Sequence, residues 1–276
     1  MNLKNIRLVG VDLDGTLLTD DKKIDSETRL AIKRAKQHGV EIVPVTGRPT
    51  SGLNKQVLAV DEFTYAITNN GANIENLKEH RSIYKRQITN ENAIKVIEAV
   101  KLEGLIYEYF SNGYAYITKK NLDYYIKIHE NSPIGEYIAE SRIAVENPFE
   151  TLKEKRLSCD EILIRYEKAE QKDRIVERIK GIRGVQFWTF ADEFLEITHN
   201  EADKGRALLA LADILNISHE NTMAFGDGEN DLTMLKSAGV SVAMENAVEI
   251  IKNSATVITG GNNNGGVAKM INKIFE

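Results

Sequence analysis

The hydrophobic residues at the start of the chain fall into short, nearly continuous runs separated by a segment of helical periodicity. Three runs predict buried strands: IRLVGV (6–11), VEIVPV (40–45) and YAIT (65–68). Residues 25–39 predict a helix between the first two runs, with Asp25 or Ser26 as its N-cap and Gly39 as its terminator. Strands that alternate with helices indicate a parallel sheet with helices on both faces.

The same alternation returns in the last third of the chain. The predicted strands are TMAFG (222–226), VSVAM (240–244) and TVIT (256–259). The predicted helices are residues 204–216, 229–239 and 247–255. We therefore expect both ends of the chain to build one α/β domain.

The middle of the chain follows a different pattern. Four aromatic-rich segments with stretches of period two are typical of an antiparallel sheet: LIYEYF (105–110), GYAYIT (113–118), EILIRY (161–166) and VQFWTF (185–190). Helical patterns near residues 90–103 and 169–181 flank them. The prediction is an α/β protein with a Rossmann-like parallel-sheet core, residues 1–84 and 196–276, and an inserted α+β domain, residues 85–195.

Composition and charge narrow the possible partners. The 276 residues carry a net charge of −5, which gives no general reason to bind nucleic acid or an anionic membrane. The single cysteine, Cys159, allows no intrachain disulfide and is expected to be buried and unreactive. The first residues lack a signal-peptide pattern, and no apolar run reaches the ~20 residues that span a bilayer. We expect a cytoplasmic protein, monomeric or homodimeric.

Four polar clusters follow predicted strands or open a predicted helix: Asp12 with Asp14, TGR (46–48), Lys204 and GDGEND (226–231). Taken singly, each is explained by a turn, a helix cap or a solvated charge. GDGEND also resembles a calcium loop, but Leu232 stands where an EF-hand needs glycine. The glycines near the C-terminus do not make a P-loop, because Val267 stands where lysine is needed.

The four clusters together indicate one site, because strand ends of a parallel sheet meet at the same edge. Asp12, Asp14 and Asp227 would repel one another there, and a bound Mg²⁺ would relieve that repulsion. The Thr46 hydroxyl and the Lys204 ammonium would add a hydrogen bond and positive charge beside the metal. Such a site suits a phosphoryl group.

DLDGTLL, TGR, KG and GDGEND, in this order, resemble the haloacid dehalogenase superfamily, and more closely its Cof-type (class IIB) branch. Further similar stretches are ITNNGA (67–72), LEITHNEADKGRALL (195–209) and NNNGGVAKMI (262–271). The loop GGNNNGGVA departs from the pattern, since relatives often carry an acid after the asparagine pair. The resemblance covers nearly the whole chain and implies that the insert is a C2B-type cap domain.

The resemblance implies that Asp12 is the nucleophile that forms an aspartyl-phosphate. Asp14 would then be the general acid for the leaving alcohol and the general base for water. Mg²⁺ would be bound by Asp12, by the backbone carbonyl of Asp14 and by Asp227. Asp231 would orient the metal shell or hold metal-bound water.

The same resemblance implies which residues bind the phosphoryl group. Thr46 and the Gly47 amide would donate hydrogen bonds to it, and Lys204 would supply positive charge. Asn230 would contact the phosphoryl group or position Lys204. Arg48 would reach the substrate or pair with an acid of the core.

Two further groups of residues have competing interpretations. Asn70 and Gly71 either line the mouth of the site or form a tight turn, and the turn is favoured. Four aromatic side chains of the insert either pack on a sugar or ring or form the core of that domain: Tyr107, Tyr109, Tyr114 and Trp188. Aromatic residues at period two favour the core.

The resulting hypothesis is a Mg²⁺-dependent phosphatase that hydrolyses small phosphorylated metabolites, such as sugar phosphates, a flavin precursor or pyridoxal phosphate. One alternative is a phosphosugar mutase, which would pass the phosphoryl group to a sugar hydroxyl instead of water. Another is a non-enzymatic protein that binds a phosphorylated metabolite. Such proteins usually lose the nucleophile or a metal ligand, and neither is lost here.

Overall fold

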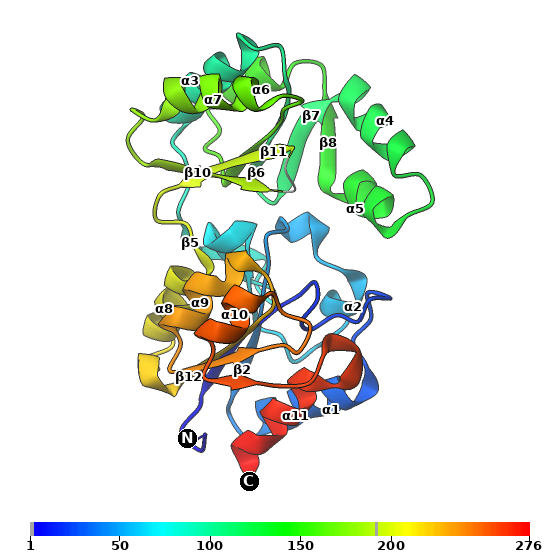
Figure 1. The fold of residues 1–276 in the computed structure, drawn as a ribbon, viewed down its shortest axis with the longest axis vertical. Coiled ribbons are helices and arrows are strands. Elements are labelled where there is room, and N and C mark those ends of the chain that lie inside the picture. Colours follow the sequence, from blue (N-terminus) through cyan, green and yellow to red (C-terminus); the bar gives the residue numbers. More distant parts are fainter. Residues whose placement is uncertain (1–2, 191–192) are drawn as a thin grey trace. The chain divides into compact units, whose positions relative to one another are not determined.

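The computed structural model describes residues 3–190 and 193–276. The chain divides into two compact units, one of residues 1–47, 53–84 and 203–276, the other of residues 48–52 and 85–202 (Figure 1). Each unit is described by itself below. Among the described residues, no helix is both long and apolar enough to cross a bilayer.

The observed division differs from the expected one in two places. The last junction follows residue 202, not residue 195, because strand β11 (Phe194–His199) pairs with β9 (Glu161–Arg165) and β10 (Val185–Phe190) of the second unit. Residues 48–52 also group with the second unit, where the Ser51 amide donates a hydrogen bond to the Gly113 carbonyl (3.0 Å).

The first unit contains an eight-stranded sheet in the order β14-β13-β12-β1-β2-β3-β4-β5. Its strands are β1 (Leu8–Asp12), β2 (Glu41–Val45), β3 (Tyr65–Thr68), β4 (Asn73–Asn76), β5 (Arg81–Lys85), β12 (Thr222–Gly226), β13 (Val240–Ala243) and β14 (Val257–Ile258). Neighbours from β14 to β3 pair in parallel, and β4 is antiparallel to β3. The predicted Rossmann-like α/β fold is confirmed.

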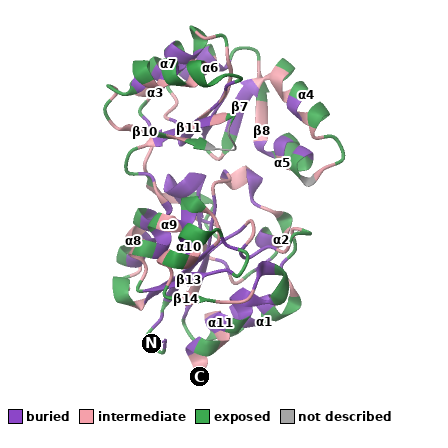
Figure 2. Cartoon of the chain, in the orientation of Figure 1, coloured by how far each residue is buried: buried purple, intermediate pink, exposed green. Residues whose placement is uncertain are grey.

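Helices cover both faces of this sheet (Figure 1). They are α1 (Ser26–Gln37), α2 (Lys55–Leu58), α8 (Lys204–Ile214), α9 (Leu232–Ser237), α10 (Glu249–Ser254) and α11 (Gly266–Asn272). Helices α8, α9 and α10 lie on one side of the sheet, and α1 and α11 on the other. The strands between them are largely buried and the outer helix faces are exposed (Figure 2).

Strand β1 determines where the functional side chains lie. All five of its residues are buried, and it pairs with β12 on one side and β2 on the other. Its register places Asp12 beside Val45 and Val11 beside Phe225. The residues that follow β1, β2 and β12 therefore meet at one edge of the sheet.

Gly205 allows helix α8 to lie close against α9. A Cβ atom at this position would stand 2.4 Å from the Thr233 carbonyl oxygen and 2.6 Å from Ser237 Oγ. Only glycine permits that approach without a shift of backbone. The glycine of the KG motif thus lets the first turn of α8 bring Lys204 down to the sheet edge.

The second unit is an α+β structure with a six-stranded sheet in the order β10-β11-β9-β6-β7-β8. Its remaining strands are β6 (Ile106–Ser111), β7 (Tyr114–Thr118) and β8 (Arg142–Val145). Its helices are α3 (Asn90–Lys101), α4 (Lys119–Ile128), α5 (Pro133–Ser141), α6 (Pro148–Glu154) and α7 (Ala169–Ile179). Helices α3, α6 and α7 pack together, while α4 and α5 lie beside β7 and β8 (Figure 1).

The core interpretation is correct for the most central aromatic residues of this unit. Tyr109 and Tyr116 are buried and stacked, with ring centroids 5.1 Å apart. Tyr114, by contrast, is exposed. Cys159 is buried as expected, and burial raises the pKa of its thiol well above the ordinary value.

Acidic residues gather on one face of the second sheet. Glu108 and Glu161 share this face, since Glu161 lies opposite Phe110 in the register of β6 with β9. Arg142 binds Glu108 through two hydrogen bonds of 2.7 and 3.1 Å. Glu161 is only 3% exposed, so burial raises its pKa well above the ordinary value, and repulsion by Glu196 and Glu108 adds to the rise.

This raised pKa predicts a pH-dependent effect of Glu161→Gln. Folded protein keeps Glu161 protonated at pH values where the unfolded chain, with a glutamate pKa of about 4, is ionised. The stabilisation that protonated Glu161 contributes is therefore fully present below the pKa of the unfolded chain. It is lost as the pH rises through the pKa of the folded protein. Glu161→Gln should raise the unfolding free energy by on the order of 1 kcal/mol at about pH 8, and change it little at about pH 4.

The measurement is denaturant unfolding followed by fluorescence of Trp188, the chain's only tryptophan, which lies in β10 of the second unit. The exposed Glu167→Gln is the matched control and should behave alike at both pH values. An effect of Glu161→Gln that is the same at both pH values would contradict the assignment.

Candidate active site

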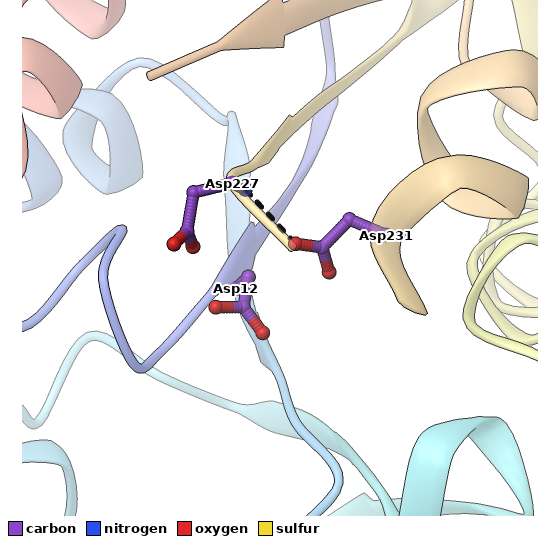
Figure 3. A group of neighbouring side chains, drawn as sticks. All are labelled: Asp12, Asp227 and Asp231. Carbon is purple, nitrogen blue, oxygen red and sulfur yellow. Dashed lines mark hydrogen bonds between the residues drawn. The ribbon is translucent and has the colours of Figure 1, made fainter. Parts of the chain in front are cut away.

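Three carboxylates converge at the carboxyl edge of the first unit's sheet (Figure 3). Asp12 ends β1, Asp227 follows β12, and Asp231 ends the 3-10 turn η4 (Glu229–Asp231). One carboxylate oxygen of each lies within 4.8 Å of the others. Asp12 and Asp231 are buried and Asp227 is half-buried. Hard oxygen donors at this spacing fit a divalent cation such as Mg²⁺.

A buried lysine contacts two of these acids. Lys204 Nζ donates hydrogen bonds to Asp12 Oδ1 (2.7 Å) and Asp231 Oδ1 (2.6 Å), and its side chain is 0% exposed. Burial alone would lower the pKa of this ammonium, but attraction by Asp12 and Asp231 outweighs it and raises the pKa. Lys204 therefore stays charged at any physiological pH.

The acids outnumber the nearby positive charges. Burial raises the pKa of Asp12 well above its ordinary value, repulsion by Asp231 adds to this, and Lys204 opposes it. Burial also raises the pKa of Asp227, and the hydrogen bond from Thr16 opposes that rise. Three carboxylates face one ammonium, so a divalent cation held by Asp12 and Asp227 would balance the charge.

Asp231 belongs to this cluster and also fixes its geometry. While Oδ1 accepts from Lys204, Oδ2 accepts hydrogen bonds from the amides of Asp227 (2.9 Å) and Gly228 (3.1 Å). Both oxygens are thus engaged by donors of the chain itself. This arrangement suits a residue that orients the lysine and the loop that carries Asp227.

The Asp-Gly-Thr sequence after Leu13 packs directly beneath Asp227. Gly15 has φ +86, and a Cβ atom there would lie 2.3 Å from Asp227 Oδ2. Thr16 Oγ1 donates a hydrogen bond to Asp227 Oδ1 (2.7 Å). Position 15 requires glycine because its φ is positive and because Asp227 lies so close. The Thr16 hydroxyl holds the Asp227 carboxylate in place.

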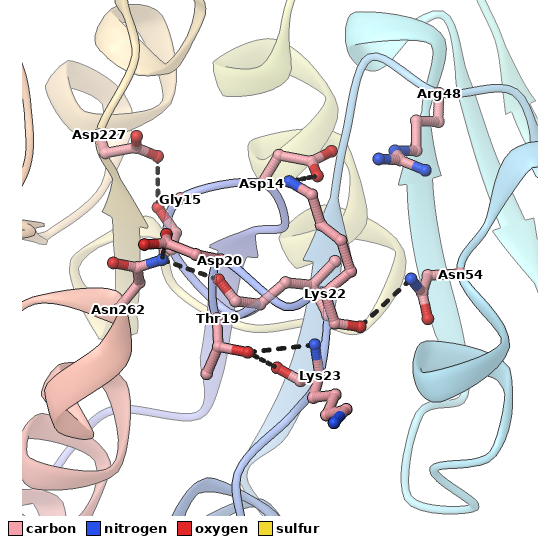
Figure 4. Close-up of polar contacts among 12 residues, drawn as sticks. Asp14, Gly15, Thr19, Asp20, Lys22, Lys23, Arg48, Asn54, Asp227 and Asn262 are labelled. Atoms are coloured by element: carbon pink, nitrogen blue, oxygen red, sulfur yellow. Dashed lines mark hydrogen bonds and ion pairs between the residues drawn. The ribbon is translucent and has the colours of Figure 1, made fainter. Parts of the chain in front are cut away.

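The Asp14 side chain lies outside the three-carboxylate cluster. Its Oδ1 accepts a hydrogen bond from Lys22 Nζ at 2.8 Å (Figure 4). Both side chains are partly exposed, at 38% for Asp14 and 36% for Lys22. Sequence reasoning did not single out Lys22, because a lysine in a polar loop carries no distinguishing pattern.

The predicted phosphate-binding residues of the first unit form a connected group. Thr46 is buried and its carbonyl accepts a hydrogen bond from the Asn70 amide (3.0 Å). Asn70 Oδ1 accepts another from Asn230 Nδ2 (3.3 Å), and a Cβ atom at Gly47 would stand 3.1 Å from that oxygen. Asn70 forms the favoured tight turn, η2 (Asn69–Gly71), and also links the two loops.

The structure also places the predicted residues Asn230 and Arg48. Asn230 Nδ2 donates a hydrogen bond to Asn70 Oδ1, and Lys204 is held by Asp12 and Asp231. Arg48 was expected to reach the substrate or to pair with an acid of the core. It groups with the second unit, where its guanidinium lies 4.8 Å from the centroid of the Tyr137 ring.

Comparisons with known proteins place the chain in a family. Residues 9–271 match the haloacid dehalogenase-like hydrolases. Phosphatase YwpJ of Bacillus subtilis is 30% identical, over 98% of this chain and 100% of the relative. A crystal structure of a haloacid dehalogenase-like hydrolase from Bacteroides thetaiotaomicron superimposes with a TM-score of 0.81, at 28% identity over 98% of this chain and 100% of that chain.

Two other relatives are named for their substrates. The 5-amino-6-(5-phospho-D-ribitylamino)uracil phosphatase YcsE of Bacillus subtilis is 27% identical, over 97% of this chain and 95% of the relative. The pyridoxal phosphate phosphatase YbhA of Escherichia coli is 28% identical, over 96% of this chain and 97% of the relative. From the motifs, the fold and the family match together, the chain belongs to the haloacid dehalogenase-like hydrolases.

Proposed function

We propose that the protein is a Mg²⁺-dependent phosphatase that hydrolyses small phosphorylated metabolites through an aspartyl-phosphate. The observation that carries this proposal is the buried contact of Lys204 with Asp12 and Asp231, beside Asp227. These four side chains combine a carboxylate nucleophile, a permanent positive charge and hard oxygen donors for a metal.

In the first step, an Asp12 oxygen attacks phosphorus, and the bond from phosphorus to the leaving oxygen breaks. Asp14 gives its proton to that oxygen, so a neutral alcohol departs. In the second step, water attacks phosphorus, Asp14 takes a proton from it, and the bond to Asp12 breaks. The products are inorganic phosphate and the original enzyme.

The remaining residues bind and neutralise the phosphoryl group. Lys204 supplies positive charge beside Asp12, and Thr46 with the Gly47 amide donates hydrogen bonds at the neighbouring strand end. Asn230 contributes a further amide. A cation held by Asp12, Asp227 and the Asp14 carbonyl would offset charge on the phosphoryl oxygens.

We assign the choice of substrate to the second unit, acting as a C2B-type cap. The 5-amino-6-(5-phospho-D-ribitylamino)uracil phosphatase YcsE and the pyridoxal phosphate phosphatase YbhA support a substrate class of small phosphorylated metabolites for this chain. Sugar phosphates belong to the same class. Pyridoxal phosphate, a phosphorylated ribitylamino compound and hexose phosphates are therefore the substrates to assay first.

Asp12→Asn should reduce hydrolysis of p-nitrophenyl phosphate in the presence of Mg²⁺ by at least about a thousandfold, because the nucleophile is lost. Phosphate and p-nitrophenol are both measured, since wild type should release them in equal amounts. Asp173→Asn, at an exposed position of α7, is the control and should retain full activity. Equal phosphate release by wild type and Asp12→Asn would refute the proposed function.

Asp14→Asn and Asp227→Asn should both abolish turnover but differ in metal binding. The Asp14 side chain lies outside the carboxylate cluster, so Asp14→Asn should change the Kd for Mg²⁺ by less than about threefold. Asp227→Asn removes a proposed ligand and should weaken binding by about tenfold or more. Isothermal titration with Mg²⁺ measures both. Comparable weakening in the two variants would contradict these separate roles.

A further inference from the structure

The loop of residues 18–23 lies next to Asp14 and has no part in the mechanism above (Figure 4). It carries Lys22, whose Nζ lies 2.8 Å from Asp14 Oδ1. Lys22 adopts a left-handed backbone conformation, with φ 58. That conformation is unfavourable for a lysine by about 1 kcal/mol, so the surrounding contacts must hold it.

The turn around Lys22 is closed by hydrogen bonds within the loop. The Lys22 amide donates to the Thr19 carbonyl (2.8 Å), and the Thr19 amide donates to the Lys23 carbonyl (2.9 Å). Asn54 Nδ2 donates to the Lys22 carbonyl at 3.4 Å. These contacts fix the backbone from which the Lys22 side chain extends toward Asp14.

Asparagines of the turn η5 (Asn262–Asn264) hold the base of this loop. The Asp20 carboxylate accepts hydrogen bonds from Asn262 Nδ2 (3.0 Å) and Asn263 Nδ2 (2.8 Å), and these donors lower its pKa. The Asp20 amide donates in return to Asn263 Oδ1 (3.0 Å). Asn262 Nδ2 also donates to the Leu18 carbonyl (3.1 Å).

The same turn is tied to the segment that follows Asp14. Asn246 Oδ1 accepts a hydrogen bond from the Asn262 amide (3.1 Å), and Asn246 Nδ2 donates to the Gly15 carbonyl (2.8 Å). The asparagine turn thus holds both sides of the contact between Asp14 and Lys22. This network gives the asparagines of η5 a structural role.

We propose that Lys22 is a positioning residue for Asp14 and that Asp20, Asn262 and Asn263 form a clamp that holds Lys22 in place. The inference rests on the proposed function, in which Asp14 transfers a proton to the leaving oxygen. Lys22 fixes Asp14 Oδ1 and so sets the direction of the carboxylate toward that oxygen. An exposed ion pair adds at most about 1 kcal/mol to stability, so we assign Lys22 the role of orienting Asp14 and not of stabilising the fold.

Two aryl esters of similar shape separate this role from a structural one. Phenolate is a poor leaving group and needs a proton from Asp14, whereas p-nitrophenolate leaves readily without one. The ratio of kcat/KM for phenyl phosphate to kcat/KM for p-nitrophenyl phosphate therefore reports proton transfer in the first step. A general loss of structure lowers both values equally.

Lys22→Met should lower kcat/KM for phenyl phosphate by about tenfold or more and for p-nitrophenyl phosphate by less than about threefold. Lys22→Arg should restore part of the lost ratio, because it keeps a donor to Asp14. Lys23→Met, at the exposed neighbouring lysine of the same loop, should leave the ratio unchanged.

The proposed clamp gives a second, independent prediction. Asn263→Ala should shift the same ratio in the same direction as Lys22→Met, and adding it to Lys22→Met should cause no further shift, because both act through one contact. An unchanged ratio in Lys22→Met, or additive effects of the two substitutions, would overturn this inference alone. Wild type that releases no phosphate from either ester would instead refute the proposed function, and this inference with it.

Discussion

The active-site edge depends on the buried ion pairs that Lys204 makes with Asp12 and Asp231. A fully buried ammonium is strongly destabilising unless charged partners surround it, and loss of one partner typically costs about 3–5 kcal/mol. Lys204 and Asp12 are 192 positions apart in the chain, so the contact joins α8 to β1 across the whole insertion. The two ends of the chain must therefore fold together before a nucleophile, a lysine and the metal-binding carboxylates can exist as one site.

Much of the first unit could be predicted because its strands are buried on both faces. Strands β3 and β12 have the predicted bounds, and the parallel order of strands brings their carboxyl ends together. Strand β8 was missed, and so were helices α4 and α5, whose apolar residues make a small separate cluster that tertiary packing completes. The sheet to which β11 belongs could not be predicted, because a short apolar run does not indicate which sheet it joins.

Within the site, the sequence could predict which residue types gather but not which atoms meet. Asn230 and Asp231 are neighbours, yet Asp231 takes the lysine because its other oxygen accepts two backbone amides of the same turn. Arg48 stands two residues after Thr46, but it groups with the second unit, where it contacts the Tyr137 ring. Such outcomes depend on loop backbone directions, which hydrophobic periodicity does not encode.

Asp12, which ends β1, and Asp14, two residues later, reduce their mutual repulsion by pairing with different lysines. The chain turns at Gly15 directly after them, and Asp12 faces Lys204 while Asp14 faces Lys22. The two environments differ in a way that fits the two proposed roles. A nucleophile gains from a dry, fixed charge partner, because water would compete for phosphorus. A residue that exchanges protons with an alcohol and then with water must remain open to both, and the Asp14 and Lys22 side chains are each more than a third exposed.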